Sequence, residues 1–239
     1  MPRQARSAPA GQIYHVTNRA NGGIRLFEKK ADFEIFEKVL ADALERVPTR
    51  LLGWCLMGDH WHLIIWPKKE GELSNFMRWV TVTHSQRRHS HRKSTGQGHI
   101  YQGRFRSFPI EKDQSLLTVL RYVERNAQRA KKVKRAEDWR WSSLWVREQG
   151  SPELRAMLSD CPVAIPRNWV ELVNRPESPE ELEALRTAVR RSAPFGSPKW
   201  VLKTATKLGL ESSLRPRGRP RKYPAKPTPA AKAKGTRKK

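Results

Sequence analysis

Four stretches of the chain have the apolar content and the two-residue alternation that are typical of β-strands. They are residues 12–18, 50–57, 60–66 and 100–110. In the fourth stretch we expect an extended chain with Arg104 and Arg106 on one face and Phe105 on the other. This alternation suits a strand edge that grips a nucleic-acid backbone, and a plain exposed strand is the alternative.

Three longer stretches carry apolar residues three or four positions apart, which predicts amphipathic helices. They cover residues 30–47, residues 73–92 and a segment that begins at Asp113 or Ser115. The predicted order is therefore β-α-β-β-α-β-α. Its first six elements match an α+β, ferredoxin-like βαββαβ sandwich with both helices on one sheet face. The third helix is extra, and it could lie across the open face of the sheet.

The third predicted strand carries two histidines. His60 and His62 are two residues apart, so both side chains point to one face while Trp61 points to the other. Two imidazoles on one face can share a metal ion, although a pair of ordinary hydrogen-bonded strand histidines is the alternative. The single His15 is interpreted as structural. On the third helix, Tyr122 and Asn126 are four residues apart and share one side.

The charge of the chain indicates a polyanionic partner. It has 48 Lys and Arg against 23 Asp and Glu, a formal net charge of +25 and a pI near 10.8. Such an excess repels itself unless it is neutralised, and nucleic acid is the expected partner. A ribosomal site or an anionic membrane would attract the same charge. The basic run 86–93, at the end of the second predicted helix, is expected to contact phosphate rather than solvent alone.

Cysteine usage and hydropathy favour a cytoplasmic protein with no membrane segment. Cys55 and Cys161 form neither a disulfide framework nor a zinc set, and Cys55 lies in an apolar run that predicts burial. The first residues lack the apolar core of a signal peptide, and no apolar run approaches the length of a membrane span.

We divide the chain into four parts. They are a flexible N-terminus (1–11), a domain that carries the histidine pair and Tyr122 (12–148), a mostly helical region (149–210) and a disordered basic tail (211–239). Within the domain, Trp139 and Trp141 are expected to be core residues. In the tail, Arg217, Gly218 and Arg219 resemble an AT-hook, whose arginines extend along the minor groove of A/T-rich duplex. A basic tail attracted to phosphate in general is the alternative.

Five motifs in order resemble one family. They are Tyr14-His15-Val16-Thr17-Asn18-Arg19, Met57-Gly58-Asp59-His60-Trp61-His62-Leu63, Gly103-Arg104-Phe105, Tyr122-Val123-Glu124-Arg125-Asn126 and Trp139-Arg140-Trp141-Ser142-Ser143. Together, over residues 12–145, they resemble the single-tyrosine, His-hydrophobic-His transposases, and most closely the REP-associated tyrosine transposases. The sequence departs from that branch at Gly58, where Pro or Asn is frequent, and at Ala127, where Pro is frequent. Neither departure removes a reacting group.

The resemblance implies a function and a set of site residues. It implies cleavage and joining of single-stranded DNA with a divalent ion, Mg²⁺ or Mn²⁺, with Tyr122 as nucleophile and with His60 and His62 as metal ligands. Asn126 stands where relatives carry a metal-binding Gln and is one methylene shorter. Arg19, with Arg104 and Arg106, would contact the DNA. The alternatives are a ring packed on the sheet for the tyrosine and a surface amide for the asparagine.

The resemblance also indicates the partners and leaves alternatives open. We expect single-stranded or hairpin DNA at repeated sequences, A/T-rich duplex through the tail, and a monomer rather than a dimer. A transposase-derived DNA-binding protein without activity is the main alternative. A ribosome-associated protein would explain the charge, but not the histidine pair together with the tyrosine.

Overall fold

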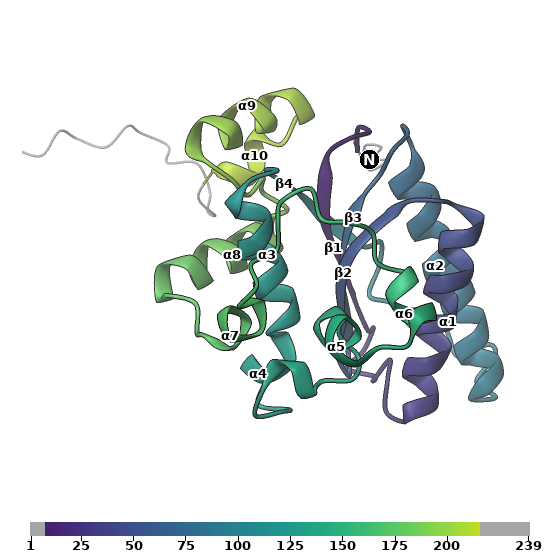
Figure 1. Cartoon of the computed structure of the whole chain (residues 1–239). Coiled ribbons are helices and arrows are strands. Elements are labelled where there is room, and N and C mark those ends of the chain that lie inside the picture. Colours follow the sequence, from purple (N-terminus) through teal and green to yellow (C-terminus); the bar gives the residue numbers. More distant parts are fainter. Residues whose placement is uncertain (1–7, 216–239) are drawn as a thin grey trace, which may run out of the picture.

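A computed structural model describes residues 8–215 of the chain and shows a four-stranded antiparallel sheet (Figure 1). The strands are β1 (Ile13–Arg19), β2 (Arg50–Leu56), β3 (His60–Trp66) and β4 (Arg106–Ile110). Their order across the sheet is β2-β3-β1-β4, so β1 and β3 are the two central strands. This order and the alternation with helices confirm the predicted α+β, ferredoxin-like architecture.

Helices α1 (Lys30–Arg46) and α2 (Glu72–His91) cover one face of the sheet (Figure 1). Trp61, Leu63 and Ile65 of β3 point into the core under these helices and are inaccessible to solvent. Trp141 stacks on Phe33 of α1 in the same core, with ring centres 4.6 Å apart. The predicted strand alternation and the predicted core role of Trp141 are therefore confirmed, while Trp139 is partly buried and packs against this core.

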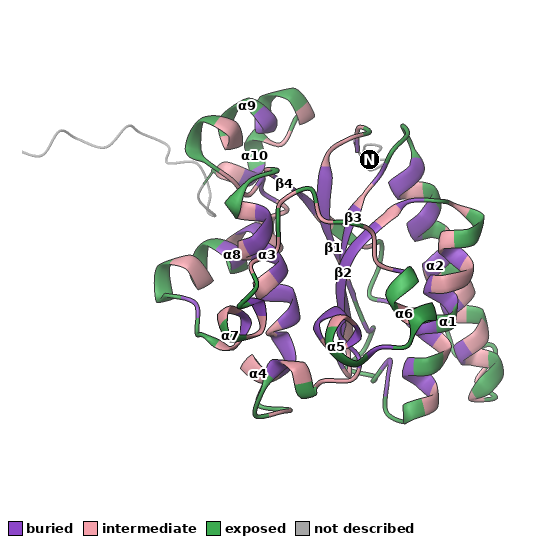
Figure 2. Ribbon diagram, viewed as in Figure 1, coloured by how far each residue is buried: buried purple, intermediate pink, exposed green. Residues whose placement is uncertain are grey.

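Helix α3 (Gln114–Glu124) lies on the opposite face and contacts β2, β3 and β4. Its apolar residues pack with Ile64 and Cys55 in a second core, and Cys55 is fully buried as predicted. Much of α3 has the colour of buried residues in Figure 2. The helix comes closest to the sheet at Gly53, where an added Cβ would lie 2.5 Å from Leu120 Cδ1. The expected extra helix on the open face is thus present, and glycine makes room for it.

This close approach gives a stability prediction. Gly53→Ala should lower the free energy of unfolding by about 1–3 kcal/mol, because the new methyl group overlaps the Leu120 side chain in a packed core. Urea unfolding measures the change. Gly58→Ala is the control, since the nearest atom to its added Cβ is at an ordinary 3.6 Å. Equal destabilisation of the two variants would contradict the packing argument.

Glu124 ties α3 to the helices that follow the sheet. Its side chain is fully buried, accepts a hydrogen bond from Ser143 Oγ at 2.6 Å and accepts another from Trp169 Nε1 at 2.7 Å. Ser143 begins α5 (Ser143–Gln149) and Trp169 begins α7 (Trp169–Asn174). The glutamate of the tyrosine motif therefore has a structural role, because it holds the tyrosine helix to two later elements.

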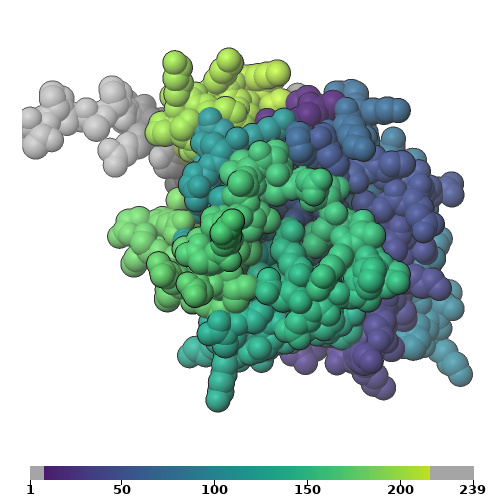
Figure 3. All heavy atoms as spheres, viewed as in Figure 1, coloured from purple at the N-terminus to yellow at the C-terminus, as the bar shows by residue number. Residues whose placement is uncertain are grey.

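The region after the sheet is mostly helical, as predicted for residues 149–210, but helical structure also includes residues 211–214, where the disordered tail was predicted to begin. Its remaining elements are α4 (Asn126–Arg129), the 3-10 turn Ala136–Asp138, α6 (Pro152–Ala156), α8 (Pro179–Arg191), α9 (Pro198–Leu208) and α10 (Glu211–Leu214). Helices α7 and α8 lie beside α3, and the green atoms of this region cover much of that side of the molecule (Figures 1 and 3). Phe195 bridges to Ile110 and so extends the β4 edge.

The predicted strand over residues 100–110 is wrong in its first half. Tyr101 makes only an isolated bridge to Ala20, and β4 begins at Arg106. The Tyr101 hydroxyl is buried between Trp61 Nε1 at 3.0 Å and His84 Nδ1 at 2.6 Å. These contacts fix Tyr101 in the core. Residues 102–105 therefore form a loop at the end of β1 and do not pair with β1 as a strand.

The chain ends differ from the prediction in part. Residues 8–11, expected to be flexible, are held in place: the Gly11 N–H donates to Pro67 O at 2.9 Å, and Trp66 Nε1 donates to Gly11 O at 3.0 Å. The AT-hook-like residues lie outside the described range. Between residues 8 and 215, no helix is both long and apolar enough to cross a membrane.

Candidate active site

The predicted site residues meet in one cleft of about 950 Å³. Seven of them line it: Arg19, His60, His62, Arg104, Arg106, Tyr122 and Asn126. They come from β1, β3, β4 and its preceding loop, α3 and α4, which are far apart in sequence. The fold therefore brings together every predicted site residue within residues 8–215, and only the three tail residues fall outside.

Each histidine of the pair has one ring nitrogen engaged by a neighbour. His60 Nδ1 lies 2.7 Å from Asp59 Oδ1, and His62 Nδ1 lies 2.8 Å from His15 Nε2. The two rings are nearly perpendicular, with centres 5.1 Å apart. Metal-binding imidazoles commonly have their second nitrogen fixed in this way, which leaves Nε2 for the ion. The donors present here fit a divalent ion held by two imidazoles.

Burial keeps both imidazoles neutral. It lowers the pKa of His62 well below the usual value, and the nearby His15, His60 and Arg129 lower it further. Burial also lowers the pKa of His60, although the Asp59 carboxylate opposes the shift. A neutral imidazole is the form that can bind a metal ion, and both histidines have this form at neutral pH.

His15 belongs to the site, which the sequence analysis missed. His15 is fully buried between His62 and Phe108. The rings of His15 and Phe108 are stacked, with their centres 4.7 Å apart. Burial lowers the pKa of His15 to about 3, so it stays neutral. The period of one strand could not reveal this, because the partnership depends on the register in which β1 pairs Thr17 with His62 and places His15 on the same face. Its role is to orient a neighbour rather than to face solvent.

Tyr122 lies in the last turn of α3 and faces the histidine pair. Its ring stands perpendicular to the His62 ring, with centres 6.2 Å apart. The flanking Val123 is fully buried in the second core, which fixes the helix rotation and directs the tyrosine into the cleft. Tyr122 is only 7% exposed and belongs to the second core, so its ring both packs on this face of the sheet and lines the cleft wall.

Asn126 lies beyond a short break in the predicted helix. Helix α3 ends at Glu124 and α4 begins at Asn126, and Arg125 between them stays in the right-handed helical region with φ −80° and ψ −3°. The asparagine is buried rather than a surface amide, and its Oδ1 accepts a hydrogen bond from Arg129 Nη2 at 3.1 Å. Tyr122 and Asn126 still share one wall of the cleft, although not one uninterrupted helix.

The three predicted DNA-contacting arginines differ in their surroundings. Arg19 is largely exposed and pairs with Asp59 Oδ2 at 2.7 Å, so Asp59 bridges it to His60. Arg104 is exposed on the loop, and Arg106 donates to Arg190 O of α8 at 3.2 Å. Burial raises the pKa of Asp59, but its bonds to His60 and Arg19 lower it more, so the carboxylate stays charged.

Among the eight further residues that line the cleft, three come from helices that follow α3 and were not predicted as site residues. They are Arg129 of α4, with Arg186 and Val189 of α8. Arg129 could have been found, because it follows Tyr122 by seven residues, about two helical turns. The other two carry no such signal, since only the packing of α8 against α3 and β4 places them at the cleft.

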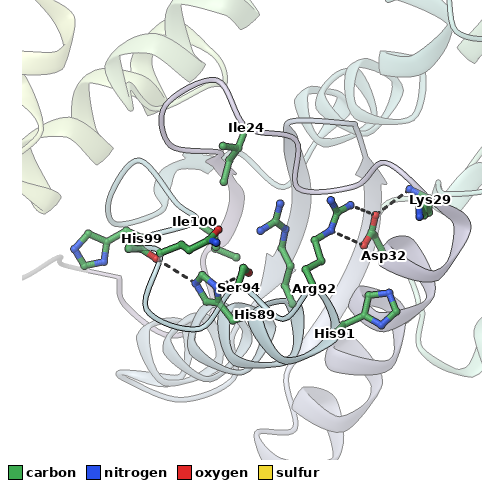
Figure 4. Close-up of a pocket in the computed structure, with 12 residues that line it drawn as sticks. Ile24, Lys29, Asp32, His89, His91, Arg92, Ser94, His99 and Ile100 are labelled. Carbon is green, nitrogen blue, oxygen red and sulfur yellow. Dashed lines mark hydrogen bonds and ion pairs between the residues drawn. The ribbon is translucent and has the colours of Figure 1, made fainter.

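A second, basic pocket of about 520 Å³ lies at the C-terminal end of α2 (Figure 4). Its arginines are engaged within the chain: Arg92 pairs with Asp32 at 2.6 Å and Arg88 donates to Arg25 O at 2.7 Å. Outside the pocket, Arg87 pairs with Asp42 at 2.6 Å. The phosphate contact expected of the run 86–93 therefore stays a prediction, with much of its charge already neutralised.

Comparisons with known proteins agree with this geometry. Residues 10–126 match the family model described as transposase IS200 like, and this stretch contains the whole sheet and Tyr122. The chain thus carries a transposase domain of the IS200-like family, as the motifs predicted. It also shares its fold with the solved structure of a REP-associated tyrosine transposase bound to a REP hairpin. That match has 16% identity and a TM-score of 0.51, and it covers 74% of this chain and 95% of that chain. No curated protein matches the sequence.

Proposed function

We propose that the protein is a metal-dependent transposase that cleaves and rejoins single-stranded DNA through a 5′-phosphotyrosine intermediate. The observation that carries this proposal is the meeting of Tyr122 with the His60–His62 pair in a cleft lined by arginines. Membership of a transposase family supports it. The hairpin complex of the protein with the same fold supports hairpin-forming DNA as the substrate.

The divalent ion is proposed from the donor set. No cluster of three or more His, Cys, Asp or Glu within residues 8–215 could hold an ion alone. His60 and His62 would supply two imidazole nitrogens and Asn126 an amide oxygen, which leaves positions for water and a phosphate oxygen. When bound, Mg²⁺ or Mn²⁺ would withdraw charge from the phosphodiester.

The remaining chemistry belongs to residues of the chain. Tyr122 Oη would form a bond to phosphorus while the bond from phosphorus to the upstream O3′ breaks, which leaves a free 3′ hydroxyl. The phenol proton must leave before or during attack, and it replaces the lost bond on O3′. Because the phosphotyrosine retains the energy of the phosphodiester, rejoining by a 3′ hydroxyl needs no ATP. Arg19, Arg104 and Arg106 would hold the flanking phosphates.

The basic tail is proposed to add affinity, with Arg217-Gly218-Arg219 in the minor groove of A/T-rich duplex. Deleting residues 215–239 should weaken DNA binding and reduce its dependence on salt, because fewer phosphate counterions are released. Fluorescence anisotropy over a series of salt concentrations measures both. A truncated protein with the full-length salt slope would show that the tail does not engage DNA.

The direct test uses purified full-length protein, a labelled pool of single-stranded hairpin oligonucleotides and Mg²⁺ or Mn²⁺. On a denaturing gel we expect a covalent protein–DNA species that requires the ion. Tight binding across a broad pool without this species would favour the alternative, a DNA-binding protein derived from a transposase.

A further inference from the structure

Arg129 contacts both predicted site residues of the helical wall. Its guanidinium carbon lies 4.0 Å from the centre of the Tyr122 ring. Its Nη2 donates to Asn126 Oδ1 at 3.1 Å, and its Nη1 donates to the backbone oxygen of Tyr122 at 3.2 Å. One side chain therefore fixes the arrangement of the tyrosine and the asparagine relative to each other.

Glu177 holds this arginine from the C-terminal region. Its side chain is 1% exposed, with Oε1 3.0 Å from Arg129 Nη1 and Oε2 2.8 Å from Arg125 Nη1. A carboxylate so well shielded from water depends on such partners, because an unpaired buried charge is costly. The two arginines and one carboxylate leave a net positive charge beside Tyr122.

The guanidinium of Arg129 retains the capacity to bind an anion. A guanidinium has five N–H donors. The two N–H groups on Nη1 donate to Tyr122 O and Glu177 Oε1, and one N–H group on Nη2 donates to Asn126 Oδ1. The Nε–H and the other Nη2 N–H have no partner among the residues that the structure describes. Arg129 lines the cleft, and a guanidinium with two such donors suits the oxygens of a phosphate.

We propose that Arg129 binds the phosphate that Tyr122 attacks and that Glu177 is a positioning residue that holds Arg129 in place. This inference rests on the proposed function and assigns a role to the C-terminal region. The family model ends at Asn126, so both Arg129 and Glu177 lie beyond it. The catalytic site is then completed by a segment that sits between α7 and α8.

The chain offers a matched control for docking alone. Glu181 of α8 forms an ion pair with Arg121 of α3, and so it joins the same two parts of the chain. Within residues 8–215, neither side chain of this pair makes a hydrogen bond or an ion pair with Tyr122 or Asn126, unlike Arg129. If Glu177 acted only by attaching the C-terminal region, the loss of either carboxylate should have a similar effect.

The test compares Glu177→Gln and Glu181→Gln in full-length protein. At saturating hairpin oligonucleotide, Glu177→Gln should slow adduct formation by about 100-fold, because a small displacement of a group at the reacting centre has that effect. Its Kd for DNA should change little, and Glu181→Gln should match the wild type in rate. Equal slowing of both variants would overturn the positioning role. Thermal melts establish that each variant is folded.

A second measurement needs no cleavage. With EDTA present, Arg129→Ala should lower the slope of log Kd against log salt by about one, the change expected for one lost phosphate contact. An unchanged slope would overturn the phosphate contact even if the wild type is active. If the wild type forms no adduct, the proposed function fails, while this slope still decides the role of Arg129.

If Glu177→Gln does not fold, Arg129→Lys replaces it in the rate assay, because lysine keeps the positive charge but loses the planar pair of N–H donors of the guanidinium. A wild-type rate for that variant would then contradict the inference.

Discussion

Tyr122→Phe should abolish the covalent protein–DNA species and leave DNA binding close to that of the wild type. The substitution removes only Oη, the proposed nucleophile, and keeps the ring that contacts His62 and Arg129. A denaturing gel detects the adduct, and anisotropy in EDTA measures the Kd. The loss should be complete within the sensitivity of the gel, because no other tyrosine among residues 8–215 lines the cleft.

The other tyrosines provide the control for this result. Tyr14 and Tyr101 are buried outside the cleft, and burial raises the pKa of each hydroxyl, so both hold their protons. Tyr223 lies in the tail, outside the described residues. Tyr223→Phe should therefore form the adduct at the wild-type rate. An adduct that persists in Tyr122→Phe and disappears in Tyr223→Phe would refute the assignment.

His60→Ala and His62→Ala should each reduce adduct formation by at least about 100-fold, as should removal of divalent ions with EDTA. Loss of an orienting partner alone typically costs about 10–100-fold in metal affinity, so loss of a ligand should cost at least as much. Electron paramagnetic resonance of free Mn²⁺ measures affinity without any need for cleavage. His15→Gln should weaken Mn²⁺ binding by about 10-fold or more, because it loses the imidazole that holds His62 Nδ1.

His91 is the matched control for these histidine variants. It is exposed at the end of α2 and lines the basic pocket rather than the cleft (Figure 4). His91→Ala should bind Mn²⁺ and form the adduct like the wild type. Wild-type Mn²⁺ affinity in both His60→Ala and His62→Ala would contradict the metal site. The proposed ion that withdraws charge from the phosphodiester would then have no binding site at the histidine pair.

Local patterns in the sequence were enough to predict the sheet and its two faces. The alternation along β3 placed Trp61 on one face and the two histidines on the other, and the structure shows Trp61 in the core under α1 and α2 and the histidines in the cleft. The four-residue step from Tyr122 to Asn126 placed both at one wall, although Arg125 interrupts the helix. These predictions succeeded because each depends on the geometry of a single strand or helix.

Long-range packing limited the rest. The partnership of His15 with His62 depends on how β1 aligns with β3, and the buried Tyr101 hydroxyl ended the predicted fourth strand early. Glu177 follows Arg129 by 48 residues, so no periodic pattern connects the two. Much of the basic charge expected to bind phosphate at the end of α2 was found in internal pairs, such as Arg87 with Asp42.

The central claim is most directly tested by locating the bond between protein and DNA. The adduct would be trimmed with nuclease, digested with trypsin and analysed by mass spectrometry. Trypsin cuts after Arg121 and Arg125, so the account predicts a nucleotide linked through its 5′ phosphate to the peptide Tyr122-Val123-Glu124-Arg125. A nucleotide on any other peptide, or no modified peptide from protein that binds the hairpin pool with Mn²⁺ present, would contradict it.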